Sequence, residues 1–248
     1  RYFKNRLIKA NVELRLSTLA TEKNLAGFDK VILATGVKPR TVKIPGVDHD
    51  KVLSYIDVLK HKANVGQSVA IIGSGGIGFD VAEYLSHPEK EIDISEDLKQ
   101  YLLEWGVDFN FEERGGLLNS SEHTESIRTI TMLQRSRGKV GARLGKTTGW
   151  IHRASLKHKN VIMKGDLEYI KIDGTGLHIR HKDERGSQIE TLEVDTVVIC
   201  AGQEPNRDLY NTLKAKQFPV SLIGGADVAT ELDAKRAIDQ GSREASKI

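Results

Sequence analysis

The sequence predicts an α/β fold of two Rossmann-like, three-layer domains, with the second inserted into the first. The glycine-rich stretch GSGGIG at 73–78 lies between an apolar run and an amphipathic segment. Two similar segments bracket it, FDKVILATGVKPR at 28–40 and VDTVVICAGQEPN at 194–206, and each is an apolar strand that ends in a glycine. This internal repeat and its glycine stretch are typical of paired nucleotide-binding domains.

Composition excludes several classes of function. The formal net charge is only +3, and Lys and Arg are spread along the chain, which disfavours the clustered basic face of a nucleic-acid-binding protein. No apolar run reaches the roughly 18 residues of a membrane span. The single cysteine, Cys200, excludes an intramolecular disulfide and a cysteine-ligated cluster within these residues, and its apolar surroundings predict a buried thiol. We therefore expect a cytoplasmic protein with neither nucleic-acid nor membrane partners.

Residues 1–62 predict part of the first domain. Apolar residues at helical spacing predict a helix in 1–10, and the alternating NVELRL at 11–16 predicts a strand. A helix and strand with no strand before them resemble the tail of a βα unit, so we expect a fragment or a processed chain. An apolar strand lies within 28–40, and a connector at 41–61 ends in a short helix.

Residues 63–205 predict the inserted domain. The glycine stretch joins a strand to a helix, and a polar, acidic insertion follows at 87–126 with one helical patch, LKQYLLEW. A strand is predicted at 127–136, then a basic loop that turns into a helix, then several short strands that close on TVVICAG at 196–202.

Residues 206–248 return to the first domain. VSLIGGADVA at 220–229 predicts a strand and a turn, and a final helix follows. Thr230 and Asp233 have the spacing of a capping box, which predicts that this helix starts near Thr230.

The glycine stretch has the spacing of a dinucleotide-binding turn. Gly73 permits the tight turn, Gly75 lets the backbone approach a pyrophosphate, and Gly78 lets the helix pack closely on the strand. The helix N-terminus offers free N–H groups to the phosphates. A structural glycine turn without a ligand is the alternative. The residues expected to contact the nucleotide are Gly73, Ser74, Gly75, Gly76, Ile77 and Gly78.

The nucleotide's identity depends on the residue that reads its ribose. An acid about 20 residues after the turn would hold a free 2′-hydroxyl, and Asp93 in EIDI is the candidate. The strand TITMLQR is the better second strand, and it ends at Arg135, followed by Arg137 and Lys139. This cationic cluster suits the 2′-phosphate of NADP, so we expect NADPH. The alternative is a solvated basic loop.

The other motifs are weaker evidence for function. LGKTTG matches the end of a Walker A loop, but Val140 stands where its first glycine belongs, so an NTPase is rejected. Lys146 and the threonines after it either hold the nicotinamide nucleotide or form a polar helix start. Asp227, on the turn after Gly225, could hold a cofactor hydroxyl or form only an Asp turn. His49, His152 and Arg153 show no partner in the sequence and are taken as surface or packing residues.

Four longer stretches resemble one family. AIIGSGGIGFDVAEYLS, LGKTTGWIHR, VVICAGQEPNR and LIGGADVATELDAKRAIDQG, with MLQR before the basic loop, are similar to the C-terminal part of the bacterial NADPH-dependent 2,4-dienoyl-CoA reductases. The resemblance covers essentially all 248 residues.

The resemblance implies an electron-entry module. In that family an FAD domain carries an inserted NADPH domain, and electrons pass from NADPH to FAD, then through a 4Fe–4S cluster and FMN to the dienoyl-CoA of fatty-acid β-oxidation. We therefore expect NADPH and FAD here, with FMN and the cluster only in a full-length protein, where an N-terminal barrel is this chain's partner. The chain alone is not expected to reduce dienoyl-CoA. No metal site or catalytic residue is predicted, because hydride transfer to a flavin needs no protein acid or base.

The family's cofactor residues transfer only where the motifs match. The second set of expected contacts, on the FAD side and at the end of TVVICAG, is Ala34, Thr35, Gly36, Gly202, Gly225, Asp227 and Val228. Two other functions remain open: a glutamate-synthase small-subunit type of electron-entry module, and a non-enzymatic NADP(H)-binding module.

Overall fold

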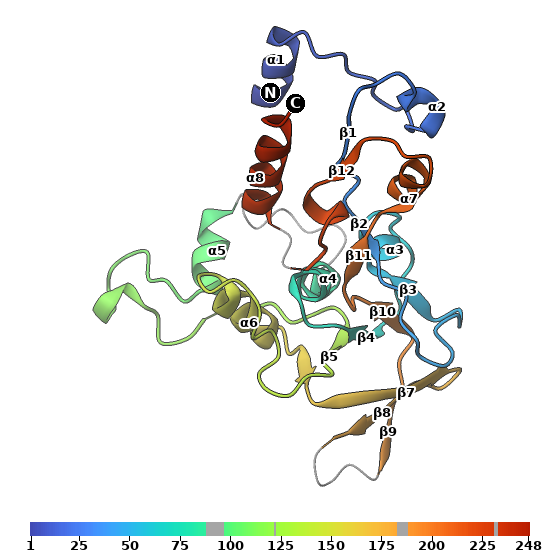
Figure 1. Cartoon of the computed structure of the whole chain (residues 1–248). Coiled ribbons are helices and arrows are strands. Elements are labelled where there is room, and N and C mark those ends of the chain that lie inside the picture. The colour runs from blue at the N-terminus through green and yellow to red at the C-terminus, as the bar shows by residue number, and fades with distance from the viewer. Residues whose placement is uncertain (88–96, 122, 183–187, 231–232) are drawn as a thin grey trace. The chain divides into compact units, whose positions relative to one another are not determined.

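The computed structural model describes residues 1–87, 97–121, 123–182, 188–230 and 233–248 (Figure 1). It divides into two compact units. Unit 1 comprises Arg1–Lys38 and Gln203–Ile248, and unit 2 comprises Pro39–Gly202. Unit 2 is therefore inserted between two halves of unit 1, as the internal repeat indicated.

The boundaries between the units differ from the predicted ones, which lay after residues 62 and 205. Strand β3 (Val52–Ser54) pairs in parallel with β10 (Thr196–Ile199) in the sheet of unit 2. The connector that leads to β3 therefore belongs to unit 2, because it holds an edge strand of that sheet.

A five-stranded parallel sheet forms the middle layer of unit 2. Its order is β3, β10, β4 (Ser68–Ile72), β5 (Thr129–Leu133) and β6 (Ile162–Lys164). β5 pairs with β4 over its whole length, so the predicted strand within 127–136 is confirmed. The EIDI segment with Asp93 lies outside the described residues.

The two faces of this sheet have different partners. Val69 and Ile71 pack with helices α3 (Tyr55–Leu59), α4 (Gly76–Ser86) and α6 (Gly149–His158). Ala70 and Ile72 pack against an antiparallel sheet of β7 (Leu167–Asp173), β8 (Gly176–His181) and β9 (Ile189–Leu192). Alternate residues of β4 thus face opposite layers, and Figure 1 shows the helices and the β7–β9 sheet on opposite sides. The predicted three-layer α/β fold is confirmed for this unit.

The described residues 97–121 and 123–128, which lie between α4 and β5, are not part of the two cores of unit 2. They contain α5 (Leu98–Glu104) and the short helix η1 (Arg114–Gly116), so the predicted helical patch is confirmed. The rings of His123 and His158 stack with centroids 3.6 Å apart, which joins these residues to the end of α6.

Unit 1 is a smaller α/β assembly. Strand β1 (Val31–Leu33) pairs in parallel with β12 (Val220–Leu222). A small core joins Val31, Leu33 and Leu213. The remaining elements are α1 (Tyr2–Lys9), α2 (Glu22–Leu25), β2 (Val37–Pro39), β11 (Gln203–Pro205), α7 (Asp208–Ala215), η2 (Gly224–Ala226) and α8 (Ala234–Ala245).

Two sequence predictions in unit 1 are wrong. Residues 11–16 form no strand, and Val12, Leu14 and Leu16 are exposed, because no described strand pairs with this segment. The last helix starts at Ala234 rather than near Thr230. Its N-cap is Asp233, whose carboxylate accepts from the Arg236 N–H at 2.7 Å.

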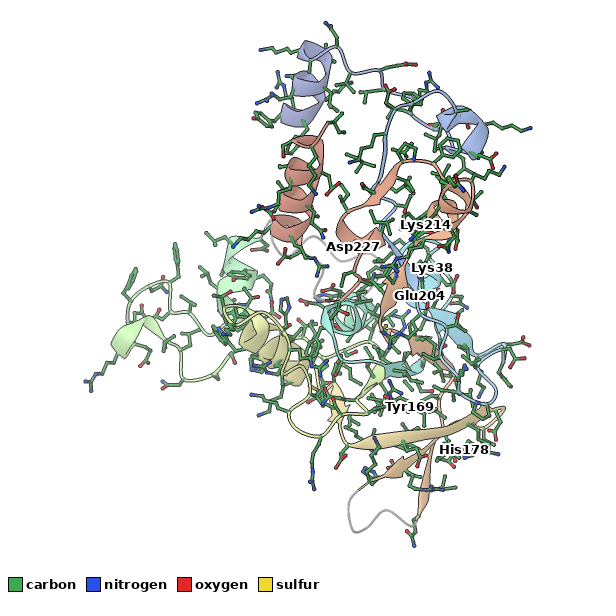
Figure 2. The ribbon with its side chains drawn as sticks, viewed as in Figure 1. Lys38, Tyr169, His178, Glu204, Lys214 and Asp227 are labelled. Carbon is green, nitrogen blue, oxygen red and sulfur yellow. The ribbon has the colours of Figure 1, made fainter. Side chains whose placement is uncertain are left out.

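The strands β2 and β11 bring together the two matching segments of the sequence. They pair as a separate two-stranded sheet. Across this sheet, Lys38 Nζ lies 3.9 Å from Glu204 Oε1 (Figure 2). Within the described ranges, no helix is both long and apolar enough to span a bilayer.

The β7–β8 hairpin carries a carboxylate that accepts hydrogen bonds from three neighbouring side chains. The Asp173 carboxylate accepts from Lys171 Nζ (2.7 Å), His178 Nε2 (2.9 Å) and the Thr175 hydroxyl (2.6 Å). These donors hold the pKa of Asp173 far below its usual value of 3.8.

We expect Asp173→Asn to lower the melting temperature at pH 7. A depressed carboxyl pKa contributes stability above the unfolded-state pKa, and this contribution falls as the pH drops toward the folded-state pKa. The difference between variant and wild type should therefore shrink progressively below about pH 4, where the unfolded carboxyl binds its proton. Thermal melts from pH 7 to pH 3 measure this difference in melting temperature. Asp50→Asn, at an exposed position, is the control. A constant difference at all pH values would contradict the assignment.

Candidate functional site

Two glycines of the turn between β4 and α4 are required by packing alone. Gly73 has φ +116°, and a Cβ on it would lie 2.4 Å from the carbonyl oxygen of Cys200. A Cβ on Gly78 would lie 2.0 Å from the carbonyl oxygen of Gly73. These clashes explain the predicted roles of Gly73 in the turn and of Gly78 in helix packing.

The other two glycines of the turn are not required by packing. A Cβ on Gly75 or Gly76 would meet nothing within 4 Å, and the Gly75 backbone is extended. Gly75 is the N-cap of α4 and provides no side chain for capping, so the first-turn N–H groups are free to face a ligand. Open space, bare backbone and a helix N-terminus fit the phosphates of a dinucleotide.

Gln134 connects this turn to the end of β5. The Ser74 hydroxyl donates to Gln134 Oε1 at 2.5 Å, and Gln134 Nε2 donates to the Ser136 carbonyl at 3.0 Å. Gln134 was not among the site residues predicted from the sequence. It occupies the place directly after β5 where a ribose-binding acid would stand, and it is neutral.

The predicted basic cluster lies on the exposed loop after β5. Arg135, Arg137 and Lys139 are all exposed. Arg137 Nε lies 3.6 Å from Asp166, so its charge is partly neutralised. Burial raises the pKa of Tyr169, a residue of β7 (Figure 2), and the charge of nearby Arg135 offsets part of this shift. The structure therefore brings Arg135 and the glycine turn to the carboxyl edge of neighbouring strands.

Gly202 and Cys200 follow the neighbouring strand β10. Gly202 has φ +98°, and its carbonyl accepts from the Arg40 N–H at 3.1 Å. Burial, together with the nearby Asp80, raises the pKa of the Cys200 thiol to about 12. The predicted buried thiol is confirmed, and such a thiol is a poor nucleophile.

His49, His152 and Arg153, which were predicted to be surface or packing residues, have structural partners. His152 Nδ1 lies 3.4 Å from Glu83 on α4, and Arg153 donates to the Gly141 carbonyl at 2.9 Å. His49 Nδ1 accepts from the Lys51 N–H. Lys146 and Thr147 are exposed in the loop before α6.

Unit 1 holds a cleft of about 450 Å³ at the carboxyl end of β1. It contains Ala34 and Gly225, two of the expected FAD contacts, and its other side is the first turns of α8 with Asp233 and Ala237. A helix N-terminus beside an apolar cleft fits a flavin, whose ring is flat and gains negative charge on reduction.

The remaining expected FAD contacts lie outside the residues that line this cleft. The Thr35 hydroxyl donates to the Asn206 carbonyl at 2.7 Å, and the Gly36 carbonyl accepts from the Asn206 N–H at 3.0 Å. The Asp227 carboxylate accepts from Gln240 Nε2 at 2.8 Å (Figure 2). The Val228 carbonyl accepts from Arg236 at 2.6 Å.

Gln240 is a second residue that the sequence analysis missed. Besides holding Asp227, its Oε1 accepts from the Gly224 N–H at 2.7 Å, so one side chain fixes both ends of this turn. Arg207 reinforces the same turn by donating to the carbonyl of Ala226 at 3.0 Å.

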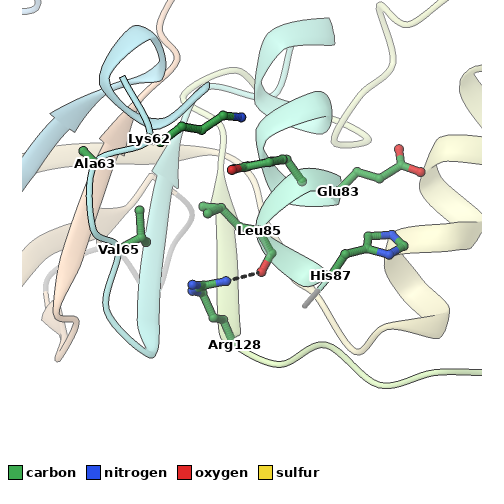
Figure 3. Close-up of a pocket in the computed structure, with 8 residues that line it drawn as sticks. Lys62, Ala63, Val65, Glu83, Leu85, His87 and Arg128 are labelled. Carbon is green, nitrogen blue, oxygen red and sulfur yellow. Dashed lines mark hydrogen bonds between the residues drawn. The ribbon is translucent and has the colours of Figure 1, made fainter. Parts of the chain in front are cut away.

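A further cavity of about 590 Å³ lies at the opposite, amino edge of β4 and β5 (Figure 3). Arg128 donates to the Leu85 carbonyl at 3.0 Å there, and Lys62 approaches the Tyr84 ring. Since the glycine turn is at the carboxyl edge, this cavity is not part of the nucleotide site.

Comparison with known proteins agrees with this architecture. The chain is 41% identical over 229 residues to the cinnamate reductase of Clostridium sporogenes, covering 92% of this chain and 28% of that protein. It is 29% identical over 252 residues to a metal reductase of Desulforamulus reducens, covering 99% and 35%. The chain thus spans about a third or less of these relatives.

Solved structures show the same fold. A 2-naphthoyl-CoA reductase in complex with 2-naphthoyl-CoA superposes with a TM-score of 0.72 at 24% identity, over all of this chain and 31% of that one. Histamine dehydrogenase from Rhizobium gives a TM-score of 0.72 at 16% identity, over all of this chain and 35% of that one. The sequence profile of the pyridine nucleotide-disulphide oxidoreductases matches residues 4–233, and the chain therefore belongs to this oxidoreductase family.

Proposed function

We propose that this chain is the electron-entry portion of an NADPH-dependent flavoprotein reductase. In this proposal unit 2 binds NADPH, unit 1 contributes to an FAD site, and a hydride passes from the nicotinamide to the flavin. FAD, when bound, accepts the two electrons of the hydride and can release them singly. Family membership supports a nucleotide-dependent oxidoreductase.

One observation carries the proposal. The glycine turn leaves Gly75 and Gly76 unobstructed at the start of α4, and neutral Gln134 and cationic Arg135 directly follow the neighbouring strand β5. The turn thus suits a pyrophosphate, and the strand end suits a 2′-phosphate better than a free 2′-hydroxyl.

The narrower proposal concerns the final acceptor. We propose a 2,4-dienoyl-CoA reductase, with a 4Fe–4S cluster and FMN held by a barrel domain outside these 248 residues. The four motifs that resemble that family support this, as does the 41% identity to a cinnamate reductase. Cinnamate and a 2,4-dienoyl thioester both have a carbon–carbon double bond conjugated to a carbonyl. NADPH oxidation that depends on 2,4-dienoyl-CoA, in a protein that joins such a barrel to this chain, is the test of this acceptor.

Gly75→Ala tests the nucleotide turn without disturbing its packing. A Cβ at Gly75 meets no protein atom, and its extended backbone suits alanine, so the melting temperature should stay unchanged. The methyl group would obstruct the pyrophosphate and weaken NADPH and NADH alike by about tenfold or more, equivalent to one lost charge-assisted hydrogen bond. Calorimetric titration measures both affinities. Unchanged affinity for both nucleotides would leave the turn purely structural.

Arg135→Glu tests the choice of nucleotide. Loss and reversal of this charge should weaken NADPH about tenfold or more and leave NADH nearly unchanged, because only NADPH has the 2′-phosphate. Lys60→Glu, at an exposed position after α3, is the matched charge-reversal control. Equal losses for the two nucleotides would contradict the 2′-phosphate assignment.

We expect the purified chain to retain FAD weakly or not at all. The 248 residues contain a single G-x-G-x-x-G stretch, which is in unit 2, so unit 1 lacks the corresponding turn for the FAD pyrophosphate. Absorbance at the flavin bands after added FAD and desalting measures retention. A stoichiometric yellow protein would overturn this expectation.

A further inference from the structure

The cavity of about 590 Å³ at the amino edge of β4 and β5 plays no part in the proposed function (Figure 3). Three separate segments meet there: the connector between α3 and β4, the end of α4, and the residues just before β5. Its volume lies in the range of sites that hold small organic molecules, about 300–1,000 Å³. The side chains that line it therefore decide which class of molecule fits.

Arg128 places a guanidinium group at this cavity with part of its donor set unused. Its Nη1 donates to the Leu85 carbonyl at 3.0 Å, whereas its Nε is buried and has no hydrogen-bond partner among the described residues. Because Nη1 is the nitrogen cis to Cδ, the bond to Leu85 does not use the opposite edge of the guanidinium, formed by Nε–H and Nη2–H. Such an edge binds a carboxylate through two parallel hydrogen bonds.

The charges around the cavity favour an anion with a single negative charge. The Leu85 carbonyl is among the last four of α4, whose partial negative charge Arg128 offsets. Lys62 adds a second positive charge from the connector. Glu83 also lines the cavity, but its carboxylate lies 3.4 Å from His152 Nδ1, and Figure 3 shows it directed away from Arg128. Two cations against one carboxylate and a helix C-terminus leave too little positive charge for a dianion.

The rest of the lining suits an apolar body. Val65 and Leu85 are buried apolar residues in the cavity wall. Tyr84 contributes an aromatic ring, and Lys62 Nζ lies 4.4 Å from the centroid of this ring. An anion that is attracted by Lys62 therefore approaches the ring as well.

We propose that this cavity binds a small organic carboxylate with an apolar body. The guanidinium of Arg128 turns its Nε edge toward the cavity and binds the carboxylate, and Lys62 adds attraction. The side chains of Val65, Tyr84 and Leu85 contact the apolar body. Since the cavity lies at the end of α4 opposite the glycine turn, this inference is independent of the proposed function.

Benzoate is the probe, and benzamide is its neutral counterpart of similar shape. Heteronuclear NMR titration follows the Arg128 Nε–H signal, which is identified by its loss in Arg128→Lys. We expect benzoate to shift this signal with a dissociation constant on the order of 1 mM, and benzamide to bind at least tenfold more weakly.

Two variants separate the fork from the charge. Arg128→Lys keeps the charge and removes the fork, and Lys62→Gln removes the second charge at an exposed position. The backbone amide signals of Val65 and Leu85 report binding in every variant. We expect benzoate affinity to fall about tenfold in Arg128→Lys and about threefold in Lys62→Gln. Lys60→Gln, at an exposed position after α3, is the matched control and should leave it unchanged.

The remaining outcomes would overturn the proposal. Absence of any benzoate-dependent shift would exclude the site, and equal binding of benzoate and benzamide would exclude recognition of the charge. Affinity that neither Arg128→Lys nor Lys62→Gln changes would show that benzoate binds elsewhere. Inorganic phosphate that binds more tightly than benzoate, and through Arg128, would replace the carboxylate by a phosphate as the ligand class. The amide signals far from the cavity should not move in Lys62→Gln, which verifies that this variant folds.

Discussion

The close packing of backbone on backbone at Gly73 is the constraint on which unit 2 depends. The carbonyl of Cys200 occupies the space of a Cβ at Gly73, and the carbonyl of Gly73 occupies that of a Cβ at Gly78. These contacts fix the end of β10, the end of β4 and the start of α4 against one another. The free N–H groups of α4 and the end of β5 consequently lie at one edge of the sheet, where an anionic ligand can contact both.

Most of the fold of unit 2 could be predicted from its sequence, because local pattern and final packing agree there. Val69, Ala70, Ile71 and Ile72 form the continuous apolar run that is typical of a strand buried on both faces, and the structure divides them between two cores. The alternating pattern at 11–16 misled, since alternation forms a strand only where another strand supplies hydrogen bonds. Helix α7 has an amphipathic sequence too short to distinguish from a loop, and its burial of Leu213 depends on distant β1 and β12.

The candidate site was predictable where one motif contains all of its residues. The glycine turn was of this kind, and Gly73 and Gly78 have the packing roles that their spacing indicated. Gln134 and Gln240 were not found, because each acts through a partner outside its own motif, such as Ser74 for Gln134 and Asp227 for Gln240. A neutral amide gives no signal until folding brings its partner close.

The pairing of β1 with β12 has a consequence for the order of folding. These strands lie on either side of the whole of unit 2 in the sequence, so joining them from an unfolded chain costs the closure entropy of a very long loop. The bond from the Arg40 N–H to the Gly202 carbonyl holds the two ends of unit 2 together once that unit has formed. The folded unit 2 then acts as a short linker between the two halves of unit 1. The pairing of β1 with β12 thereby becomes a local step in folding.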